Sequence, residues 1–462
     1  WGFHDQIHYY QNRGDGSFED MTVAAALKGV TGGLNIRQTD YNNDGNIDVL
    51  ILRGAWFRDQ GRVPNSLLRN NGDGTFTDVT VKAGLYTKRP SQNAVWADFD
   101  MDGWLDLFIG NEAVPDGGPD FYFPSELYHN QKDGTFKEVS AQANLQIVAF
   151  VKGSTGGDIN NDGKPDLYLS ILNGNNRLFL NESDESGIKF REISNTAGIG
   201  EPYVSFPTWM FDYNNDGWLD IFVSAYSDGS EDLPGKVLRA YGKKDDPFRP
   251  RLYRNNGNGT FTDMSIGMGL TEPVFTMGSN YGDLDNDGFP DFYLGTGEPN
   301  LKSIVPNKMY WNRGGTSYAD VTYAGGFGNI QKGHGVAWAD LDMDGDQDIY
   351  EKLGGSFEGD VYQSVLFENP IQNGNHWIVL RLEGVRSNRK AIGARVEVEI
   401  TEQGKSRKIW EMVGPGSSFG GNSLQLEIGL GQAEKINSVK IYWPVKDVAP
   451  QEINGLAVDK AY

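Results

Sequence analysis

The 462-residue chain contains no cysteine and only five histidines. The absence of cysteine excludes a disulfide scaffold, a thiol nucleophile and zinc sites built on thiolates. No apolar run approaches the roughly 18 residues that a transmembrane helix needs, so we expect no membrane-spanning segment. The chain opens at Trp1 without a methionine or a charged-then-apolar leader. We therefore expect a preceding segment, including a signal peptide removed by processing.

Common catalytic signatures are missing as well. The sequence has no H-E-x-x-H metal site, no G-x-S-x-G nucleophile elbow and no phosphate-binding loop. Its formal net charge of −22 argues against a nucleic-acid partner, because a phosphate backbone repels an acidic surface. A hydrophobic content of 38% with 12% aromatics nevertheless provides enough apolar surface for a folded core.

Much of the acid is concentrated in six nine-residue segments that fit D-x-[DN]-x-D-G-x-x-D. They are residues 40–48, 98–106, 158–166, 212–220, 283–291 and 340–348. Calcium takes six to eight oxygen ligands, and alternate side chains on a tight turn can converge on one ion. The glycine at position 6 permits that turn. We therefore predict about six bound Ca²⁺ ions.

Positions 1, 3, 5 and 9 would supply side-chain oxygens, and position 7 would supply its backbone carbonyl. The predicted ligands are Asp40, Asn42, Asp44, Asn46, Asp48, Asp98, Asp100, Asp102, Trp104, Asp106, Asp158, Asn160, Asp162, Lys164, Asp166, Asp212, Asn214, Asp216, Trp218, Asp220, Asp283, Asp285, Asp287, Phe289, Asp291, Asp340, Asp342, Asp344, Asp346 and Asp348. Five of the six segments lack the acidic twelfth residue of an EF-hand, and each is followed by a β-rich run. The side-chain positions carry 21 carboxylates, and six Ca²⁺ ions would bring the net charge to −10.

A second motif, typified by LLRNNGDGTFTDVT at 67–80, precedes each segment. Its asparagine lies 28 residues before the first aspartate in five periods and 31 in one. Turns rich in Gly and Asp between apolar-aromatic runs indicate tight hairpins. With the strands around each acidic segment, one period contains four strands, such as 93–98, 106–110, 126–130 and 135–140. This period is typical of β-propeller blades.

These repeats resemble the FG-GAP/VCBS family, whose calcium-loop blades also form the propeller of integrin α-subunits. The fold class is therefore expected to be all-β, with a propeller over residues 1–369. The resemblance implies seven blades. Counting strands alone leaves six or seven, because six full periods follow one N-terminal strand pair at 7–22.

Beyond Pro370 the repeat stops, and five alternating segments indicate a small β-sandwich-like domain over 370–462. Asn388 to Val396, the GLG at 429–431 and VKIYWP at 439–444 resemble the ASPIC/UnbV domain. This combination is similar to the cartilage acidic protein family and its secreted bacterial relatives. The resemblance implies an exported calcium-binding protein, in an extracellular or periplasmic location.

In an antiparallel meander the acidic segments and the NGDGTF hairpins share one face of the propeller, which leaves the longer loops on the other. Function tends to concentrate in such variable loops. The longest, at 227–251, is basic and contrasts with the acidic body. Candidate ligand or partner contacts on this face are Arg53, Trp56, Arg58, Tyr122, Lys243, Lys244, Arg249, Glu298 and His334.

Three functions fit the sequence. The leading hypothesis is a non-enzymatic, calcium-stabilised protein that binds a protein, carbohydrate or small-molecule ligand through the face opposite the calcium loops. An enzyme, such as a cyclase, a lyase or a carbohydrate-active enzyme, would have its site in the axial funnel, with His334 and Glu298 nearby. For His334 a packing role between blades is the alternative to a role in the funnel. The third hypothesis is a structural subunit of a larger surface assembly.

Overall fold

The computed structural model describes residues 5–226, 248–297, 305–354, 362–370, 373–414 and 416–462. Over these ranges the regular secondary structure is almost entirely β-strand, as predicted. The few helical segments are short and lie in connections between strands: η1 (Arg58–Gly61), η2 (Pro119–Phe121) and α1 (Ser194–Ala197). None of the helices in the described part of the chain is long and apolar enough to cross a membrane.

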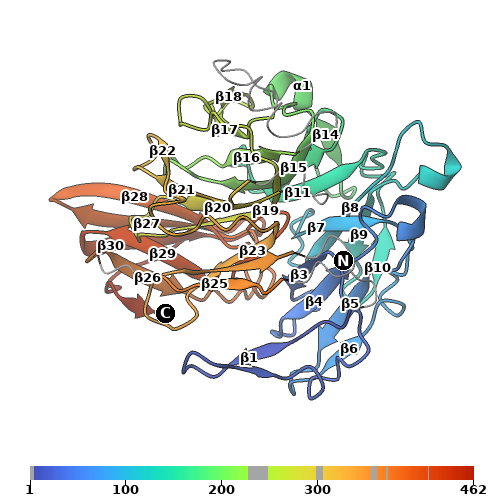
Figure 1. Cartoon of the computed structure of the whole chain (residues 1–462), viewed down its shortest axis with the longest axis horizontal. Coiled ribbons are helices and arrows are strands. Elements are labelled where there is room, and N and C mark those ends of the chain that lie inside the picture. The colour runs from blue at the N-terminus through green and yellow to red at the C-terminus, as the bar shows by residue number, and fades with distance from the viewer. Residues whose placement is uncertain (1–4, 227–247, 298–304, 355–361, 371–372, 415) are drawn as a thin grey trace.

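Five antiparallel four-stranded sheets follow one another along the chain, and a three-stranded sheet ends the series. In each sheet the first strand in sequence lies nearest the central axis around which the sheets are arranged. The strands are β3 (Asn35–Thr39), β4 (Asp48–Leu52), β5 (Ser66–Asn70), β6 (Phe76–Asp78); β7 (Ser91–Ala97), β8 (Asp106–Asn111), β9 (Glu126–Asn130), β10 (Phe136–Glu138); β11 (Val151–Gly157), β12 (Asp166–Ile171), β13 (Arg177–Asn181), β14 (Phe190–Glu192); β15 (Ser205–Phe211), β16 (Asp220–Ala225), β17 (Arg251–Asn255), β18 (Phe261–Asp263); β19 (Thr276–Gly282), β20 (Asp291–Thr296), β21 (Lys308–Asn312), β22 (Tyr318–Asp320); and β23 (Gly333–Ala339), β24 (Asp348–Leu353), β25 (Val365–Phe367). These six sheets are blades 1 to 6 of a β-propeller (Figure 1).

Neighbouring blades pack face to face through aromatic and aliphatic side chains, because a single sheet cannot bury both of its faces alone. In the core between blades 4 and 5, Trp209 stacks on Phe222 with 4.1 Å between ring centroids, and both side chains are fully buried. Tyr281 of the fifth blade also stacks on Trp209, with 5.8 Å between ring centroids. The hydrophobic cores therefore lie between blades, and they fix the ring geometry on which the loops are mounted.

The asparagine of the second motif forms hydrogen bonds between neighbouring blades. Asn130 donates from Nδ2 to the carbonyl of Tyr41 in the preceding blade at 2.9 Å, and Asn181 does the same to Phe99 at 2.9 Å. Every later blade repeats this link, through Asn255, Asn312 and Asn369. The motif is thus a hydrogen-bonded connector that ties each blade to the blade before it.

This link also assigns the N-terminal hairpin of β1 (Tyr10–Asn12) and β2 (Phe18–Asp20). Asn12 donates to the carbonyl of Leu341 in blade 6 at 2.7 Å, as a blade that follows the sixth would. Asn70 of blade 1 bonds within its own blade, to the carbonyl of Ile47. The ring therefore has seven positions, and β1 and β2 form the outer half of the seventh.

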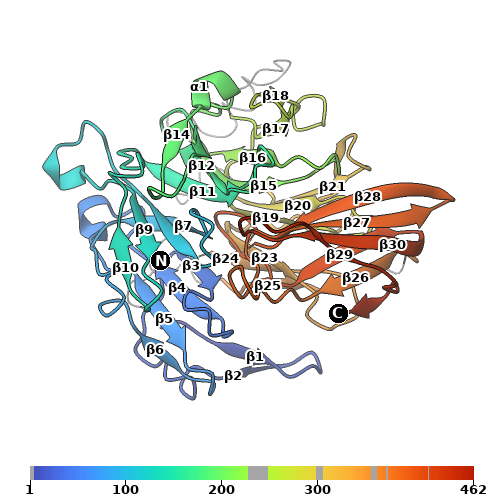
Figure 2. The ribbon, with the colours of Figure 1, turned by 180° about the vertical axis from the view of Figure 1, so that it is seen from behind.

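The C-terminal strands form two sheets that enclose one hydrophobic core, as predicted for a sandwich-like domain. One sheet contains β29 (Leu426–Gly431), β26 (His376–Leu380) and β32 (Lys460–Ala461), and the other contains β28 (Lys405–Met412), β27 (Arg395–Glu402), β30 (Ala433–Tyr442) and β31 (Gln451–Ile453). In both ribbon views these red strands lie beside the blades of β19–β25 (Figure 2).

One loop of this domain, residues 416–424, enters the axis of the propeller, and we term it the axial loop. The N–H of Ser418 donates to the carbonyl of Thr208 in blade 4, and Oγ of Ser418 accepts a hydrogen bond from the N–H of Thr208. The N–H of Gly421 donates to the carbonyl of Val336 in blade 6. At Gly420 φ is +144°, and a Cβ would lie 2.0 Å from the carbonyl oxygen of Val336, so only glycine fits this approach. The axial loop therefore fills the propeller axis at this level.

Candidate metal centres

The six acidic loops connect the first and second strands of their blades, and their backbones adopt one shared conformation. In the first loop, Asp40 accepts hydrogen bonds from the N–H groups of Asp44 (3.1 Å) and Gly45 (2.9 Å). Asp48 at position 9 accepts one from the N–H of Asn70 at 2.8 Å. The equivalent bonds recur in all six loops, so hydrogen bonds within the protein orient the carboxylates at positions 1 and 9.

In several loops the carboxylates converge. Oxygens of Asp98, Asp100 and Asp106 lie within 4.8 Å of one another, as do those of Asp283, Asp285 and Asp291 and those of Asp340, Asp342 and Asp344. The first two clusters are largely buried, and like charges that lie this close in a buried place need a counter-charge. Burial raises the pKa of Asp98 to about 8, with the neighbouring carboxylates adding to the effect.

Some of these oxygens have no partner within the protein. Oδ1 of Asp100, Oδ1 of Asp285 and Oδ2 of Asp220 are buried and accept no hydrogen bond. Buried polar atoms in native proteins are almost always satisfied, and bound ions account for some of the exceptions. The donor set is almost purely oxygen, which fits a hard divalent cation such as Ca²⁺. The residues present therefore fit a metal in these loops.

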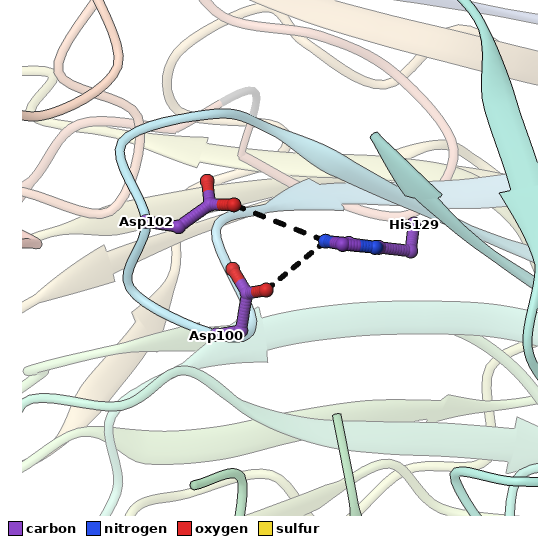
Figure 3. Close-up of side chains that lie close together, drawn as sticks. All are labelled: Asp100, Asp102 and His129. Carbon is purple, nitrogen blue, oxygen red and sulfur yellow. Dashed lines mark ion pairs between the residues drawn. The ribbon is translucent and has the colours of Figure 1, made fainter. Parts of the chain in front are cut away.

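The second loop differs from the rest because a histidine faces it (Figure 3). Nε2 of His129, on the third strand of the blade, lies 3.0 Å from Asp100 and 3.8 Å from Asp102. Lys132 adds an ion pair to Asp102 at 2.9 Å. Because Ca²⁺ prefers oxygen to nitrogen, we interpret His129 as an ion-pair partner that orients the carboxylates.

Position 4 of the loops, which the sequence motif leaves undefined, has a structural role that sequence reasoning missed. All six residues here adopt a left-handed φ between 53° and 64°. Where the residue is asparagine, Nδ2 donates to the position-6 glycine carbonyl of the next loop. These bonds run from Asn43 to Gly103, Asn161 to Gly217, Asn215 to Gly288 and Asn286 to Gly345. Asparagine tolerates this backbone conformation, which is the signal that could have singled it out.

The same asparagines also form hydrogen bonds with the C-terminal domain. Oδ1 of Asn43 accepts a hydrogen bond from the N–H of Arg389 at 2.9 Å, and Oδ1 of Asn215 accepts one from Trp410 at 2.8 Å. Arg395 bonds to both Asn161 and the carbonyl of Gly217. The C-terminal domain thus sits on the face that carries the acidic loops, and this face is an interdomain interface.

The predicted contact residues on the opposite face fall into two groups. Tyr122 is 54% exposed, and Arg58 is exposed as well. Arg53 is buried, and its guanidinium donates to the carbonyls of Gly32, Pro64 and Thr31 and to Ser66, so its donors are used within the protein. Arg249 is also buried and lies 3.3 Å from Asp263.

Trp56 and His334 lie deeper, close to the axis. The Trp56 ring covers the buried Lys152, with the ammonium 3.2 Å from the ring centroid, and Lys152 forms an ion pair with Glu112. His334 is buried next to Phe419 of the axial loop, and burial lowers its pKa to about 4. Its surroundings fit the packing role. Lys243, Lys244 and Glu298 lie outside the described residues.

Comparison with known proteins agrees with this architecture. The FG-GAP-like repeat model matches residues 40–109, 158–223 and 212–294, and the ASPIC and UnbV model matches residues 384–462. The chain is therefore an FG-GAP-repeat β-propeller followed by an ASPIC and UnbV domain. It is similar to cartilage acidic protein 1 of Mus musculus, with 25% identity over 291 residues, which is 61% of this chain and 41% of that protein. The Homo sapiens protein is 25% identical over 297 residues, which is 61% of this chain and 40% of that protein.

The chain spans about two fifths of the length of these curated relatives. Among solved structures, it is similar to the rhamnogalacturonan lyase YesW, with a TM-score of 0.37 and 11% identity over 93% of this chain and 72% of that one. The Dos1 propeller gives a TM-score of 0.35 and 9% identity over 92% of this chain and 81% of that one.

Proposed function

We propose that the protein is a calcium-stabilised binding protein that works in an extracellular or periplasmic compartment. The observation that carries the proposal is the set of six acidic loops with one backbone conformation, among which three have converging carboxylates and three have unpartnered buried oxygens. Calcium sites of extracellular modules are weak, and they suit compartments where the ion is abundant. The FG-GAP-like repeats and the similarity to cartilage acidic protein 1 support the same reading.

Each ion would act as a cross-link. Positions 1 to 5 lie on the turn, whereas position 9 begins the second strand of the blade and is bonded to the third through the connector asparagine. A cation bound there compensates the carboxylate charge and joins the turn to the sheet. Because an ion that binds only the folded state stabilises it by mass action, six sites would add substantially to the stability of a chain without disulfides.

We propose that ligand binding uses the face opposite the acidic loops. The C-terminal domain covers the loop face, whereas Arg58 and Tyr122 remain exposed on the connections between second and third strands. The ligand class is a protein, a carbohydrate or another small molecule. Exposed tyrosine and arginine side chains are typical of contact surfaces, in which both residue types are enriched.

The calcium assignment is testable by titration calorimetry of metal-free protein with Ca²⁺. We expect the double variant Asp98→Asn and Asp106→Asn to bind one ion fewer than the wild type and to melt at a lower temperature in calcium. The matched control is Asp73→Asn, which makes the same change on an exposed hairpin turn outside the loops. Equal stoichiometry in all three proteins would overturn the assignment of that loop.

A further inference from the structure

A cavity of about 920 Å³ lies between the propeller and the C-terminal domain. Its propeller wall is formed by residues of β3, β7 and β11 and of the acidic loops of blades 2, 3 and 4. Its other wall is formed by the C-terminal domain, through residues 392, 393, 395, 410, 412–414, 416 and 442–450. Its volume falls in the range of small-molecule sites, and sites between domains are common. None of the functions discussed above uses this space.

The cavity contains a buried charge without a counter-ion. Arg37 on β3 lines it, is 2% exposed, and forms one hydrogen bond, from Nη1 to the carbonyl of Gly420 at 3.0 Å. Its Nε has no partner, and no carboxylate in the described part of the chain pairs with it. Burial lowers the pKa of Arg37 to about 10, with no acidic group opposing the effect.

An isolated buried cation is costly, and proteins retain one only when something compensates it. Arg53 shows how this chain satisfies a buried guanidinium that has a structural role, through four hydrogen bonds. Arg37 lacks such partners. Its planar fork suits a carboxylate, which can accept two parallel hydrogen bonds from it.

The remaining surface of the cavity suits a ring. Trp218 of the fourth acidic loop and Trp410, Tyr442 and Trp443 of the C-terminal domain all line it, and none of them is fully buried. On the propeller wall, the hydroxyl of Ser154 is buried without a hydrogen-bond partner. Flat aromatic walls with a few orienting polar groups are the usual composition of a small-molecule site.

Other charges on the walls limit which ligand fits. Arg395, Lys164 and Lys446 add positive charge, although Arg395 is already bonded to Asn161 and Gly217. The carboxylates at the cavity are Asp447 and members of the acidic loops, such as Asp98 and Asp158. A cation in those loops would offset their charge and leave Arg37 to bind the ligand anion.

We propose that this cavity binds a small acidic carbohydrate, with its carboxylate on Arg37 and its ring against the tryptophans. The test is calorimetric titration of calcium-loaded protein with three probes. D-glucuronate has both the ring and the charge, D-glucose has the ring without the charge, and acetate has the charge without the ring. A hydrogen-bonded charge contributes about 1.5–3 kcal/mol, so glucuronate should bind about ten- to a hundredfold more tightly than glucose.

Variants separate a ligand-binding role of Arg37 from a structural one. Arg37→Met should abolish the preference for glucuronate over glucose while leaving the melting temperature of the ligand-free protein unchanged or raised, because an unpaired charge is removed. Arg53→Met, the matched buried arginine, should lower that temperature because its four bonds are lost. Arg37→Lys keeps the charge and should retain part of the preference.

Several results would overturn the proposal. They are an absence of glucuronate binding to the wild type, equal affinity for glucuronate and glucose, and unchanged selectivity in Arg37→Met. If Arg37→Met does not fold, the comparison of probes on the wild type and on Arg37→Lys still decides the question. Titrating Arg37→Met with Ca²⁺ separates this site from the metal sites, because the variant should lose the preference for glucuronate and still bind as many Ca²⁺ ions as the wild type.

Discussion

The hydrogen bonds of the position-4 asparagines lead us to predict that one substitution on the propeller destabilises its contact with the C-terminal domain. Asn215→Gly removes the bond from Nδ2 to Gly288 at 2.7 Å and the bond that Oδ1 accepts from Trp410 at 2.8 Å. Two such bonds contribute about 2 kcal/mol together. Glycine adopts the left-handed backbone without the steric cost of about 1 kcal/mol that a side chain adds. The free energy of unfolding should therefore fall by about 1 kcal/mol.

The matched control is Met343→Gly. Met343 occupies position 4 of the sixth loop with φ of 64°, and its side chain is 72% exposed. In this control the steric cost of the left-handed backbone is removed and no hydrogen bond is lost. Its free energy of unfolding should therefore be about 1 kcal/mol higher than that of the wild type. Urea unfolding in calcium should separate the two variants by about 2 kcal/mol.

Hydrogen exchange gives a more local measurement of the same effect. The amide of Trp410 should exchange faster in Asn215→Gly than in the wild type, because its acceptor is missing, and Met343→Gly should leave it unchanged. Equal unfolding free energies in the two variants, together with unchanged exchange at Trp410, would refute a role for position 4 in docking the domain.

Three further predictions concern buried groups near the axis. Phe419→Ala should cost about 3–5 kcal/mol in urea unfolding, because the axial loop loses its buried anchor against Phe206. Lys152→Met should also cost about 3–5 kcal/mol, since Glu112 keeps an uncompensated buried charge, and adding Glu112→Leu should recover much of that loss. Burial raises the pKa of Glu351 to about 8, so the folded state keeps this carboxyl protonated where the unfolded chain would ionise it. The free energy of unfolding should therefore fall as the pH rises from about 5 to about 8. Glu351→Gln should make the free energy of unfolding less dependent on pH over this range.

Each of these predictions has an outcome that contradicts it. A Phe419→Ala protein as stable as the wild type would mean that the axial loop is not anchored by this ring. A double variant no more stable than Lys152→Met would show that the ion pair is not the origin of the loss. An unchanged pH profile in Glu351→Gln would assign the dependence to other groups.

The propeller could be predicted because its determinants are local and repeated. Positions 1 to 9 of each acidic loop and the strands around them follow from residues close in sequence, such as Asp98 and Asp106. The connector asparagines could be located by their constant distance from the loops, although their partners could not. Asn130 bonds to Tyr41, 89 positions away, and no spacing in the sequence reveals such a contact.

The placement of the C-terminal domain could not be predicted, since it depends on surfaces brought together by folding. Asn35 contacts Ser418 across 383 positions. For the same reason, Arg53 resembled a surface contact in the sequence, whereas the fold buries it among backbone carbonyls. Arg37 sits on an ordinary strand pattern, and its unpaired charge becomes visible only when the cavity around it is known.

The central claim, that calcium in the six loops stabilises this fold, is tested most directly by thermal unfolding with and without calcium. The melting temperature should fall by many degrees when a chelator removes the ion, and adding Ca²⁺ should restore it, while Mg²⁺ should restore it poorly because it demands a smaller, octahedral site. An unchanged melting temperature after complete calcium removal would contradict the account.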